Sequence, residues 1–325
     1  MKLPRRQVLH LTAGAAALPA VSRVARAKTY PTRPVRILVG FAAGQAIDII
    51  VRVIAQWLSD QLGQQFVVEN RPGAGGNIAT EVVVRSAPDG YTLIAVGMNN
   101  TINATLYEKL SFNFIRDIAP IASILRAPQV MLVNPSVPAN TVPEFITYAK
   151  ANPGKINMAS AGNGSPTHLS GELFKMMTGI NLLHVPYRGS PAALTDLISG
   201  QVQVMFDNVA SSIGHIRAGK MRALAVTTAT RWEGLPDIPP VSDFVPGFET
   251  GGLAGFGAPK DTPAEIVQKL NKEVNAALDD AKVKTRLVEL GGTILPGSPA
   301  DFGKLIAAET EKWSKVIRTG NIRPQ

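Results

Sequence analysis

Short apolar runs alternate along this chain with longer segments in which apolar residues recur at helical spacing. Val35–Val39 is a continuous run of the kind that a parallel sheet buries on both faces. Ile50, Ile54 and Leu58 then recur at helical spacing, and Gly63 is expected to end that helix. Further strands are expected at residues 66–68, 92–96, 130–133, 156–159, 183–185, 202–206 and 223–226. This alternation predicts an α/β fold with mostly parallel sheets.

Several helix starts can be read from capping residues. Thr141 and Thr262 each open a capping box, while Ser165, Ser190 and Ser298 each stand before a proline suited to the first helical position. Large apolar residues at helical spacing are expected in the core. These core candidates are Trp57, Phe145, Phe174, Met176 and Met177.

Two places along the chain are predicted domain crossings. Residues 235–252 are rich in proline and glycine, and a second crossing is expected near Arg126 to Pro128, just before an apolar strand. Two crossings divide the chain into a discontinuous first domain, residues 28–128 and 247–325, and an inserted second domain, residues 129–246. A cleft between two α/β domains is a common binding place for small ligands.

The N-terminus resembles an export signal. Residues 1–27 contain five basic and no acidic residues, a short apolar stretch and a small-x-small sequence at Ala25 to Ala27. Arg5 and Arg6 resemble a twin-arginine signal, although Pro4 departs from that pattern, so the export route stays open. We therefore expect cleavage after Ala27 and a periplasmic protein.

Composition excludes several functional classes. The 325 residues contain no cysteine, which excludes disulfides, thiolate metal sites, a cysteine nucleophile and a lipidated-cysteine anchor. The net charge of +9 falls to +4 without residues 1–27, which leaves 28 basic against 24 acidic residues. Aromatic residues make up only 6% of the chain and the remainder has no basic run, so nucleic-acid binding is not expected.

Catalytic and cofactor motifs are not found either. The histidines His10, His168, His184 and His215 lack metal-ligand spacing, and there is no Walker, G-x-S-x-G or S-x-x-K motif. The glycine-rich residues 71–78 lack the third glycine of a dinucleotide loop, so they are interpreted as a tight turn before a helix at 77–85. We expect no metal, no cofactor and no enzymatic activity.

Two loops share one physical design. Residues 40–48 and residues 160–168 each join a buried strand to a helix N-terminus through small residues. Unpaired N–H groups and the positive end of a helix favour an anion. Facing each other across a cleft, the loops would grip a carboxylate from both sides. The alternative is that both are ordinary turns in which Asp48 and Ser165 only cap the backbone.

Longer motifs carry a resemblance to a known family. The motifs are residues 41–48, 70–78, 87–92, 160–168, 185–189 and 201–208, with Ala258-Pro259 and the helix after Thr262. In this order they resemble the solute receptors of tripartite tricarboxylate transporters, the Bug family. The resemblance implies a type II-like periplasmic-binding-protein fold of two α/β domains that close on a small carboxylate. It also implies delivery of that ligand to the transporter's membrane components.

The resemblance also implies a set of ligand-binding residues, most of them in the two loops. In the first loop they are Phe41, Gly44, Gln45, Ala46, Ile47 and Asp48. In the second they are Ser160, Ala161, Gly162, Asn163, Gly164, Ser165, Thr167 and His168. The expected neighbours in the cleft are Asn100, Tyr187, Asp207 and Asn208. A helix-capping role for His168 and a turn role for Asp207 and Asn208 remain alternatives.

The first loop departs from the family pattern. Where relatives usually have glycine and then threonine or serine, this chain has Gln45 and Ile47. Loss of a hydrogen bond to a charged group would weaken binding about tenfold or more unless Gln45 compensates. We hypothesise that Ile47 favours an aromatic or otherwise bulky carboxylate over a small aliphatic one.

Two other functions fit the same sequence. A ligand-sensing receptor that docks to a membrane signalling protein would have the same signal and the same domains. An exported enzyme acting on a carboxylate would need a nucleophile or base that the residue spacing does not reveal, although Asp48 and His168 could meet across the cleft. We expect a monomeric receptor without a cofactor.

Overall fold

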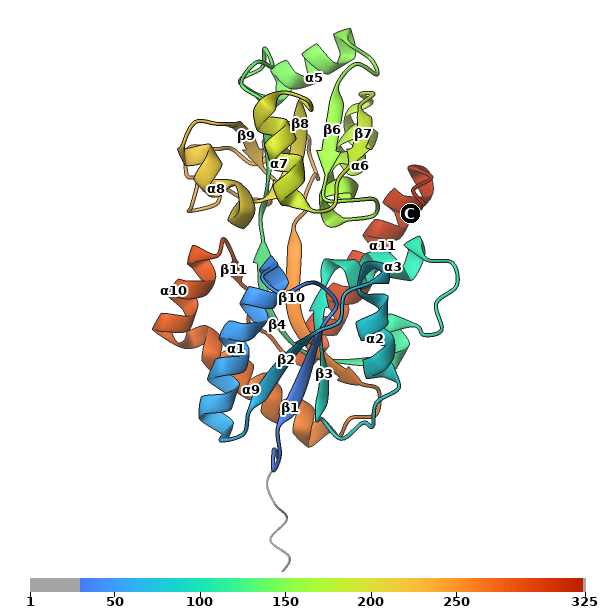
Figure 1. The fold of residues 1–325 in the computed structure, drawn as a ribbon, viewed down its shortest axis with the longest axis vertical. Helices are drawn as coiled ribbons and strands as arrows, with labels where there is room; N and C mark the ends of the chain where they lie inside the picture. Colours follow the sequence, from blue (N-terminus) through green and yellow to red (C-terminus); the bar gives the residue numbers. More distant parts are fainter. Residues whose placement is uncertain (1–29, 324–325) are drawn as a thin grey trace, which may run out of the picture.

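The strands form two separate sheets, each with helices on both faces (Figure 1). The structure is a computed structural model and describes residues 30–323, so the predicted export signal lies outside the described residues. The six-stranded sheet has the order β11 (Thr293–Ile294), β4 (Ile118–Ala127), β10 (Gly252–Pro259), β3 (Thr92–Gly97), β1 (Val35–Val39) and β2 (Phe66–Asn70). The five-stranded sheet has the order β7 (Leu183–Pro186), β6 (Asn157–Ser160), β8 (Val204–Asn208), β5 (Gln129–Val133) and β9 (Arg222–Val226).

Each sheet and its helices form one lobe. The helices of the six-stranded lobe are α1 (Ala46–Leu62), α2 (Asn77–Val84), α3 (Met98–Leu106), α4 (Phe114–Asp117), α9 (Ala264–Asp279), α10 (Ala281–Glu289) and α11 (Pro299–Thr319), with a 3₁₀ turn η1 (Ala74–Gly76). Those of the five-stranded lobe are α5 (Val142–Ala151), α6 (Pro166–Thr178), α7 (Ser190–Ser199) and α8 (Val209–Arg217). A further 3₁₀ turn, η2 (Val241–Asp243), follows β9. None of the described helices is both long and apolar enough to cross a membrane.

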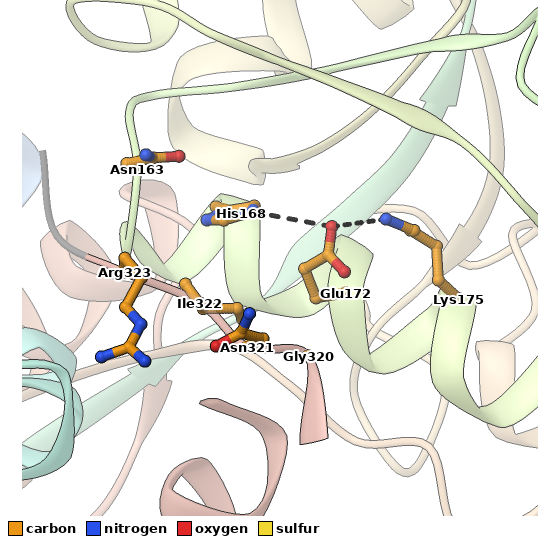
Figure 2. A pocket seen from close by; sticks show the side chains of 8 residues that line it. All are labelled: Asn163, His168, Glu172, Lys175, Gly320, Asn321, Ile322 and Arg323. Atoms are coloured by element: carbon orange, nitrogen blue, oxygen red, sulfur yellow. Dashed lines mark hydrogen bonds and ion pairs between the residues drawn. The ribbon is translucent and has the colours of Figure 1, made fainter. Parts of the chain in front are cut away.

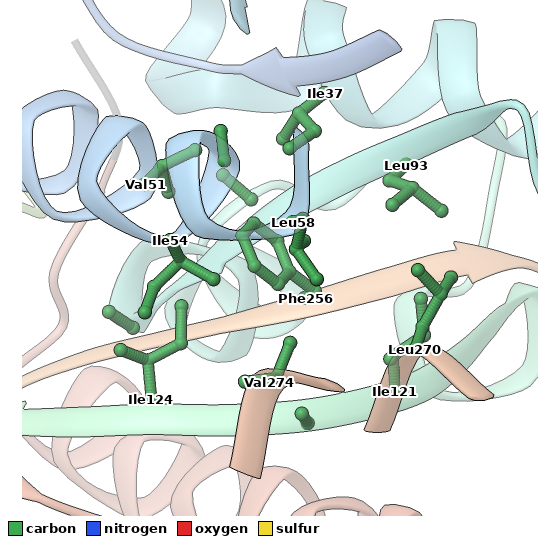
Figure 3. Packing of buried hydrophobic residues seen from close by; sticks show 14 of the residues in the cluster. Ile37, Val51, Ile54, Leu58, Leu93, Ile121, Ile124, Phe256, Leu270 and Val274 are labelled. Carbon is green, nitrogen blue, oxygen red and sulfur yellow. The ribbon is translucent and has the colours of Figure 1, made fainter. Parts of the chain in front are cut away.

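Apolar side chains fill the space between each sheet and its helices. In the six-stranded lobe, Ile54 and Leu58 of α1 and Leu270 of α9 pack with Phe256 of β10 (Figure 3). Phe145 and Phe174 are fully buried in the five-stranded lobe, as predicted, and Trp57 is partly buried against the core of the other lobe. The prediction for Met176 and Met177 is wrong. Both are 39% exposed, because this face of α6 points away from the sheet.

Strand direction differs from the sequence prediction. The pairs β1–β2, β1–β3, β6–β7 and β6–β8 are parallel, as expected from strand–helix–strand units. However, β10 is antiparallel to β3 and β4, β11 to β4, and β5 to β8 and β9. The prediction of mostly parallel sheets is therefore wrong, because the strands that connect the two sheets enter each one against the direction of its parallel strands.

The chain passes between the sheets at two neighbouring places. It leaves β4 at Ala127 and enters β5 at Gln129, and it returns from β9 to β10 through residues 227–251. Thr227 holds the two passages together, because its N–H donates to the Gln129 carbonyl at 2.9 Å and its hydroxyl donates to the Thr250 carbonyl at 2.9 Å. Residues of the returning segment, Val241 to Phe248, pack in the core of the five-stranded lobe.

Three of the five predicted helix caps are confirmed. Thr141, Ser165 and Ser298 each accept a backbone N–H from three residues ahead. The other two predictions are wrong. The Thr262 hydroxyl donates to the Pro259 carbonyl, and α9 begins two residues later without a side-chain cap. Ser190 is already inside α7, and its hydroxyl donates to Asp207.

The glycine-rich segment at 71–78 is a tight turn before α2, as interpreted from the sequence. Gly73, Gly75 and Gly76 adopt positive φ angles, a region that glycine enters without strain. A Cβ on Gly40 would lie 2.6 Å from the Gly76 Cα. The turn therefore packs directly against the start of the first loop.

Candidate functional site

Both candidate loops begin at the C-terminal end of a strand, on the side of their sheet that faces the other lobe. This row of strand ends is called the facing edge of the sheet. In the six-stranded sheet, Gly97 at the end of β3 pairs with Ala254, two residues from the Gly252–Ala127 pair where the chain crosses. Since β1 is parallel to β3, the first loop begins at this same edge. In the other sheet, Asn208 at the end of β8 pairs with Gln129, and β6 is parallel to β8. The second loop therefore begins at the edge nearest the crossing as well.

The first loop, residues 40–48, is held by one buried carboxylate. Asp48 is 2% exposed and accepts hydrogen bonds from the Gly44 N–H at 2.8 Å and the Asn70 amide at 2.9 Å. Arg52, one turn along α1, pairs with it at 2.9 Å. Burial raises the pKa of Asp48, but these hydrogen bonds and the Arg52 charge outweigh burial and lower it overall. Asp48 therefore stays ionised and orders the loop.

The surface of the first loop is open. Residues 42–46 are exposed, and Phe41 and Ile47 are partly buried against the core. Gln45 precedes α1 but provides no side-chain cap, so the N–H groups of the first turn remain available to another acceptor. The loop thus offers backbone donors and the positive end of a 17-residue helix.

The second loop, residues 160–168, is held by neutral polar groups. The Ala161 N–H donates to the Thr167 hydroxyl at 2.8 Å, and the Ser165 hydroxyl donates to the Gly162 carbonyl at 2.6 Å. The Gly164 N–H donates to Nδ1 of His168 at 3.0 Å. Ser165 also caps α6 by accepting the His168 N–H. Much of the loop's own hydrogen-bonding capacity is therefore used inside it.

A histidine that the sequence analysis did not select lies beneath this loop. The rings of His168 and His184 are stacked with centroids 3.6 Å apart, and Nε2 of His184 lies 2.6 Å from the Ser160 hydroxyl oxygen. Burial, followed by the proximity of His168, lowers the pKa of His184 to about 4. His184 lies on a short edge strand with no motif around it, so no sequence signal marked it.

A small cavity of about 300 Å³ lies on the outer side of His168 (Figure 2). Asn163 and His168 of the second loop line one side, with Glu172 and Lys175 further along α6. The C-terminal residues 320–323 of the six-stranded lobe form the other side. Glu172 lies 3.6 Å from Nε2 of His168 and 2.8 Å from the Lys175 amine.

Some of the predicted cleft neighbours use their side chains in hydrogen bonds within the fold, and others do not. Asn100 is buried and bonds to the Gly97 N–H and to Thr80, and the Tyr187 hydroxyl donates to Asp196 at 2.6 Å. Burial and that carboxylate raise the pKa of Tyr187 to about 12. By contrast, Asn208 precedes α8 without capping it.

Asp207 is fully buried and ties two helices together. Its two oxygens accept the hydroxyls of Ser190 in the first turn of α7 and of Ser211 in the first turn of α8. Burial raises the pKa of this carboxyl even though both hydroxyls favour its charged form. Asp207 thus fixes two more helix N-termini at the facing edge of the five-stranded sheet.

The lobes also touch away from the crossing. Leu169 of α6 is fully buried in one apolar cluster with Leu106 of α3 and Trp313 and Ile317 of α11. A Cβ on Gly164 would lie within van der Waals overlap of Leu106, 2.2 Å from its Cδ2. Figure 1 shows α6 of one lobe close to α11 of the other. This seam supports the second loop from the six-stranded lobe.

The arrangement favours an anion without a cationic cluster. Helices α1, α3, α6, α7 and α8 all begin just after strands that end at the facing edges. Helix N-termini present N–H donors and partial positive charge. Among residues 30–323, no group of three or more acidic or histidine side chains is arranged to hold a metal ion.

Comparison with known proteins gives a consistent result. The family described as "Tripartite tricarboxylate transporter family receptor" matches residues 50–322. The chain is similar to R. palustris Rpa4515, solved with adipate, at 39% identity and a TM-score of 0.83, covering 91% of this chain and all of the other. It is also similar to MatC from Rhodopseudomonas palustris, solved with malate, at 33% identity and a TM-score of 0.78, covering 89% and 100%.

A further similar structure is that of the periplasmic binding protein BugD. The identity is 34% and the TM-score 0.79, over 91% of this chain and 100% of that one. This chain shares the two-lobed fold of these neighbours, of which BugD is a periplasmic binding protein. The chain belongs to the Bug family of solute-binding receptors of tripartite tricarboxylate transporters.

Proposed function

We propose that this protein is an extracytoplasmic receptor that binds a small carboxylate between its lobes and delivers it to a tripartite tricarboxylate transporter. The observation that carries the proposal is the placement of both loops, with their helix N-termini, at the facing sheet edges. Adipate and malate, the acids in the two R. palustris structures, support a carboxylate as the ligand.

The lobes correspond to two proposed domains. The first comprises residues 28–128 and 247–325, and the second comprises residues 129–246. The passage of the chain at Pro128 and the packing of Val241 and Val245 in the five-stranded lobe support these bounds, whereas Phe248, just beyond the second bound, still packs in that lobe. Hinge motion about the two passages would close the lobes on the ligand.

We assign the ligand contacts to groups whose hydrogen bonds are not already used. In the first loop these are the N–H groups at the start of α1 and the Gln45 amide. In the other lobe they are the side chains of Asn163 and Asn208. Other predicted site residues do not contact the ligand in this assignment but hold the loops and helices that carry these groups. They are Asp48, Asn100, His168, Tyr187 and Asp207.

Export is part of the proposal. Residues 1–27 would direct the chain to the periplasm and be removed, and BugD, a similar structure, is a periplasmic binding protein. The mature protein would then meet its ligand and the transporter in the same compartment.

A thermal-shift screen of the chain from Lys28 onward tests the proposal. The panel contains aliphatic dicarboxylates, tricarboxylates, acidic amino acids and aromatic acids. A ligand at about 100 times its dissociation constant adds about 2.7 kcal/mol of stability, which should raise the melting temperature by several degrees. Stabilisation by one class of acid is expected. A folded protein that no acid stabilises would contradict the carboxylate assignment, and turnover of a bound acid would favour an exported enzyme.

A further inference from the structure

The second loop rests on a continuous row of polar groups that starts at the cavity of Figure 2. Glu172 lies 3.6 Å from Nε2 of His168, whose ring stacks on His184, and His184 contacts the Ser160 hydroxyl. His168 also accepts the Gly164 N–H. Through these contacts the two histidines touch the loop at its start, Ser160, and at its middle, Gly164.

The hydrogen bond from Gly164 defines the protonation state of His168. A ring nitrogen that accepts an N–H carries no proton, so Nδ1 is bare and the proton of the neutral ring lies on Nε2, toward Glu172. A second proton can only be added at Nδ1, where it would point at the Gly164 N–H. Two donors cannot share a hydrogen bond, so protonation of His168 must break this contact with the loop.

The surroundings of His168 provide a second arrangement for the charged ring. Glu172 attracts an imidazolium, whereas Lys175, Arg323 and a charged His184 would repel it. His184 remains neutral at mildly acidic pH because burial depresses its pKa to about 4. A second proton on His168 therefore exchanges the Gly164 bond for an ion pair with Glu172, at a ring that lines the cavity.

We propose that His168 and His184 are positioning residues of the ligand site, which hold the second loop in its binding geometry only while both rings are neutral. This inference rests on the proposed function, because it assigns the regulation of the same site. The receptor should bind its acid more weakly once His168 carries a second proton.

The first test needs no ligand. Amide and imidazole signals of the protein are followed by NMR from about pH 8 to about pH 5.5, the range in which histidine side chains commonly change charge. We expect the Gly164 amide to shift together with the His168 ring. In His168→Asn, whose side-chain oxygen can replace Nδ1 as an acceptor, the Gly164 amide should stay constant. A Gly164 amide that does not respond while the His168 ring titrates would overturn the proposal.

The second test measures malate affinity over the same pH range. We expect wild-type affinity to fall about tenfold, the value of one net hydrogen bond. His168→Asn should lose this pH response, and His168→Phe, which has no acceptor, should bind weakly at every pH. His215→Asn, on α8, is the matched control and should keep the wild-type response. Protonation of malate itself affects all variants equally, so the ratio between variants is the readout.

His184 is tested separately with His184→Phe. This variant keeps an aromatic face against His168 but removes the contact with Ser160, so affinity should fall up to about tenfold while the pH response remains. Wild-type affinity in this variant, or a full pH response in His168→Asn, would contradict the proposal. If no acid binds at any pH, the proposed function fails, and the Gly164 amide titration still decides the role of His168.

Discussion

The two loops that face each other across the lobes are built in opposite ways. The first is exposed and is held by Asp48, a carboxylate paired with Arg52. The second is more buried and is held by hydroxyls and imidazoles. Another buried carboxylate of this lobe, Asp207, is bonded by hydroxyls and a backbone N–H rather than by a cation. One loop therefore depends on a charge that must be present, and the other on groups that must remain neutral.

This difference appears in the direction of the pKa shifts. The pKa of Asp48 is lowered because Arg52, Gly44 and Asn70 outweigh its burial, whereas burial raises that of Asp207. A group with a lowered pKa stabilises the fold until the pH falls through that value, whereas a buried acid with a raised pKa favours the folded state as it takes up a proton. Acidification should therefore protonate Asp207 before Asp48.

The largest expected effect comes from removing the anchor of the first loop. Asp48→Ala should lower the free energy of unfolding by about 2–4 kcal/mol, because three partners lose their acceptor and Arg52 loses its counter-ion. Ligand affinity should fall with it. Urea unfolding and calorimetric binding measure both quantities. Asp60→Ala, on the exposed part of α1, should change stability by less than about 0.5 kcal/mol; an equal loss in both variants would deny Asp48 this role.

Ser160→Ala tests the neutral support of the second loop. The hydroxyl is buried and is shared by His184 and the Gly162 backbone, so its removal should cost about 1–2 kcal/mol, less than the loss of Asp48. Chemical denaturation gives the value. Ser199→Ala removes an exposed hydroxyl at the end of α7 and should be close to wild type. A cost as large as that of Asp48→Ala would mean that the loops do not differ in how they are held.

Ile47→Thr tests whether the first loop sets ligand preference. A hydroxyl in the first turn of α1 should tighten binding of small dicarboxylates by up to about tenfold and leave aromatic acids unchanged or weaker. Ile47→Val matches threonine in shape without the hydroxyl and should keep the wild-type preference. Competition binding with both classes of acid measures the change. An unaltered preference in Ile47→Thr would remove Ile47 as a determinant.

Asp207→Asn has the smallest expected effect. The informative result is whether the stability of the wild type relative to this variant rises or falls as the pH is lowered. The amide can still bond to Ser190 and Ser211, so stability near neutral pH should change little. Because the pKa of Asp207 is raised in the folded state, the wild type binds this proton more tightly when folded and gains stability as the pH falls. The variant lacks that gain. Melting temperatures across pH give the difference, and a wild type that loses stability relative to the variant in acid would reverse the assignment.

The strands that the sequence predicted share one property, which is a compact apolar run. Val35–Val39 is an example, because four of its five residues are apolar and fully buried. The long strands β4 and β10 were missed because alanine, glycine and proline interrupt their apolar pattern. These two strands connect the lobes and run antiparallel to their neighbours, so the omission explains the incorrect prediction of strand direction in the six-stranded sheet. In the other sheet the strand at β5 was predicted, but its direction against β8 and β9 was not.

The sequence predicts the strand–loop–helix junctions of the candidate site, but it does not predict which polar side chains are used within the fold. Strand–loop–helix junctions identify where donors gather, because helix N-termini carry them in every protein. Whether a polar side chain faces a ligand or its own backbone depends on tertiary contacts, as with Asp48 and the Asn70 amide across 22 residues. The same limit concealed His184, which acquires its importance only by stacking on a ring from another element.

The Thr227 bond that joins the two passages has a consequence for how such receptors can be recombined. Thr227 is hydrogen-bonded to both Gln129 and Thr250, so the segment of residues 129–250 enters and leaves the rest of the chain at one point. A segment with adjacent ends behaves as a module that can be exchanged without changing the path of its host. Because each lobe contributes one loop, such exchange between relatives would combine half-sites of different origin, and new ligand preferences would arise from existing parts.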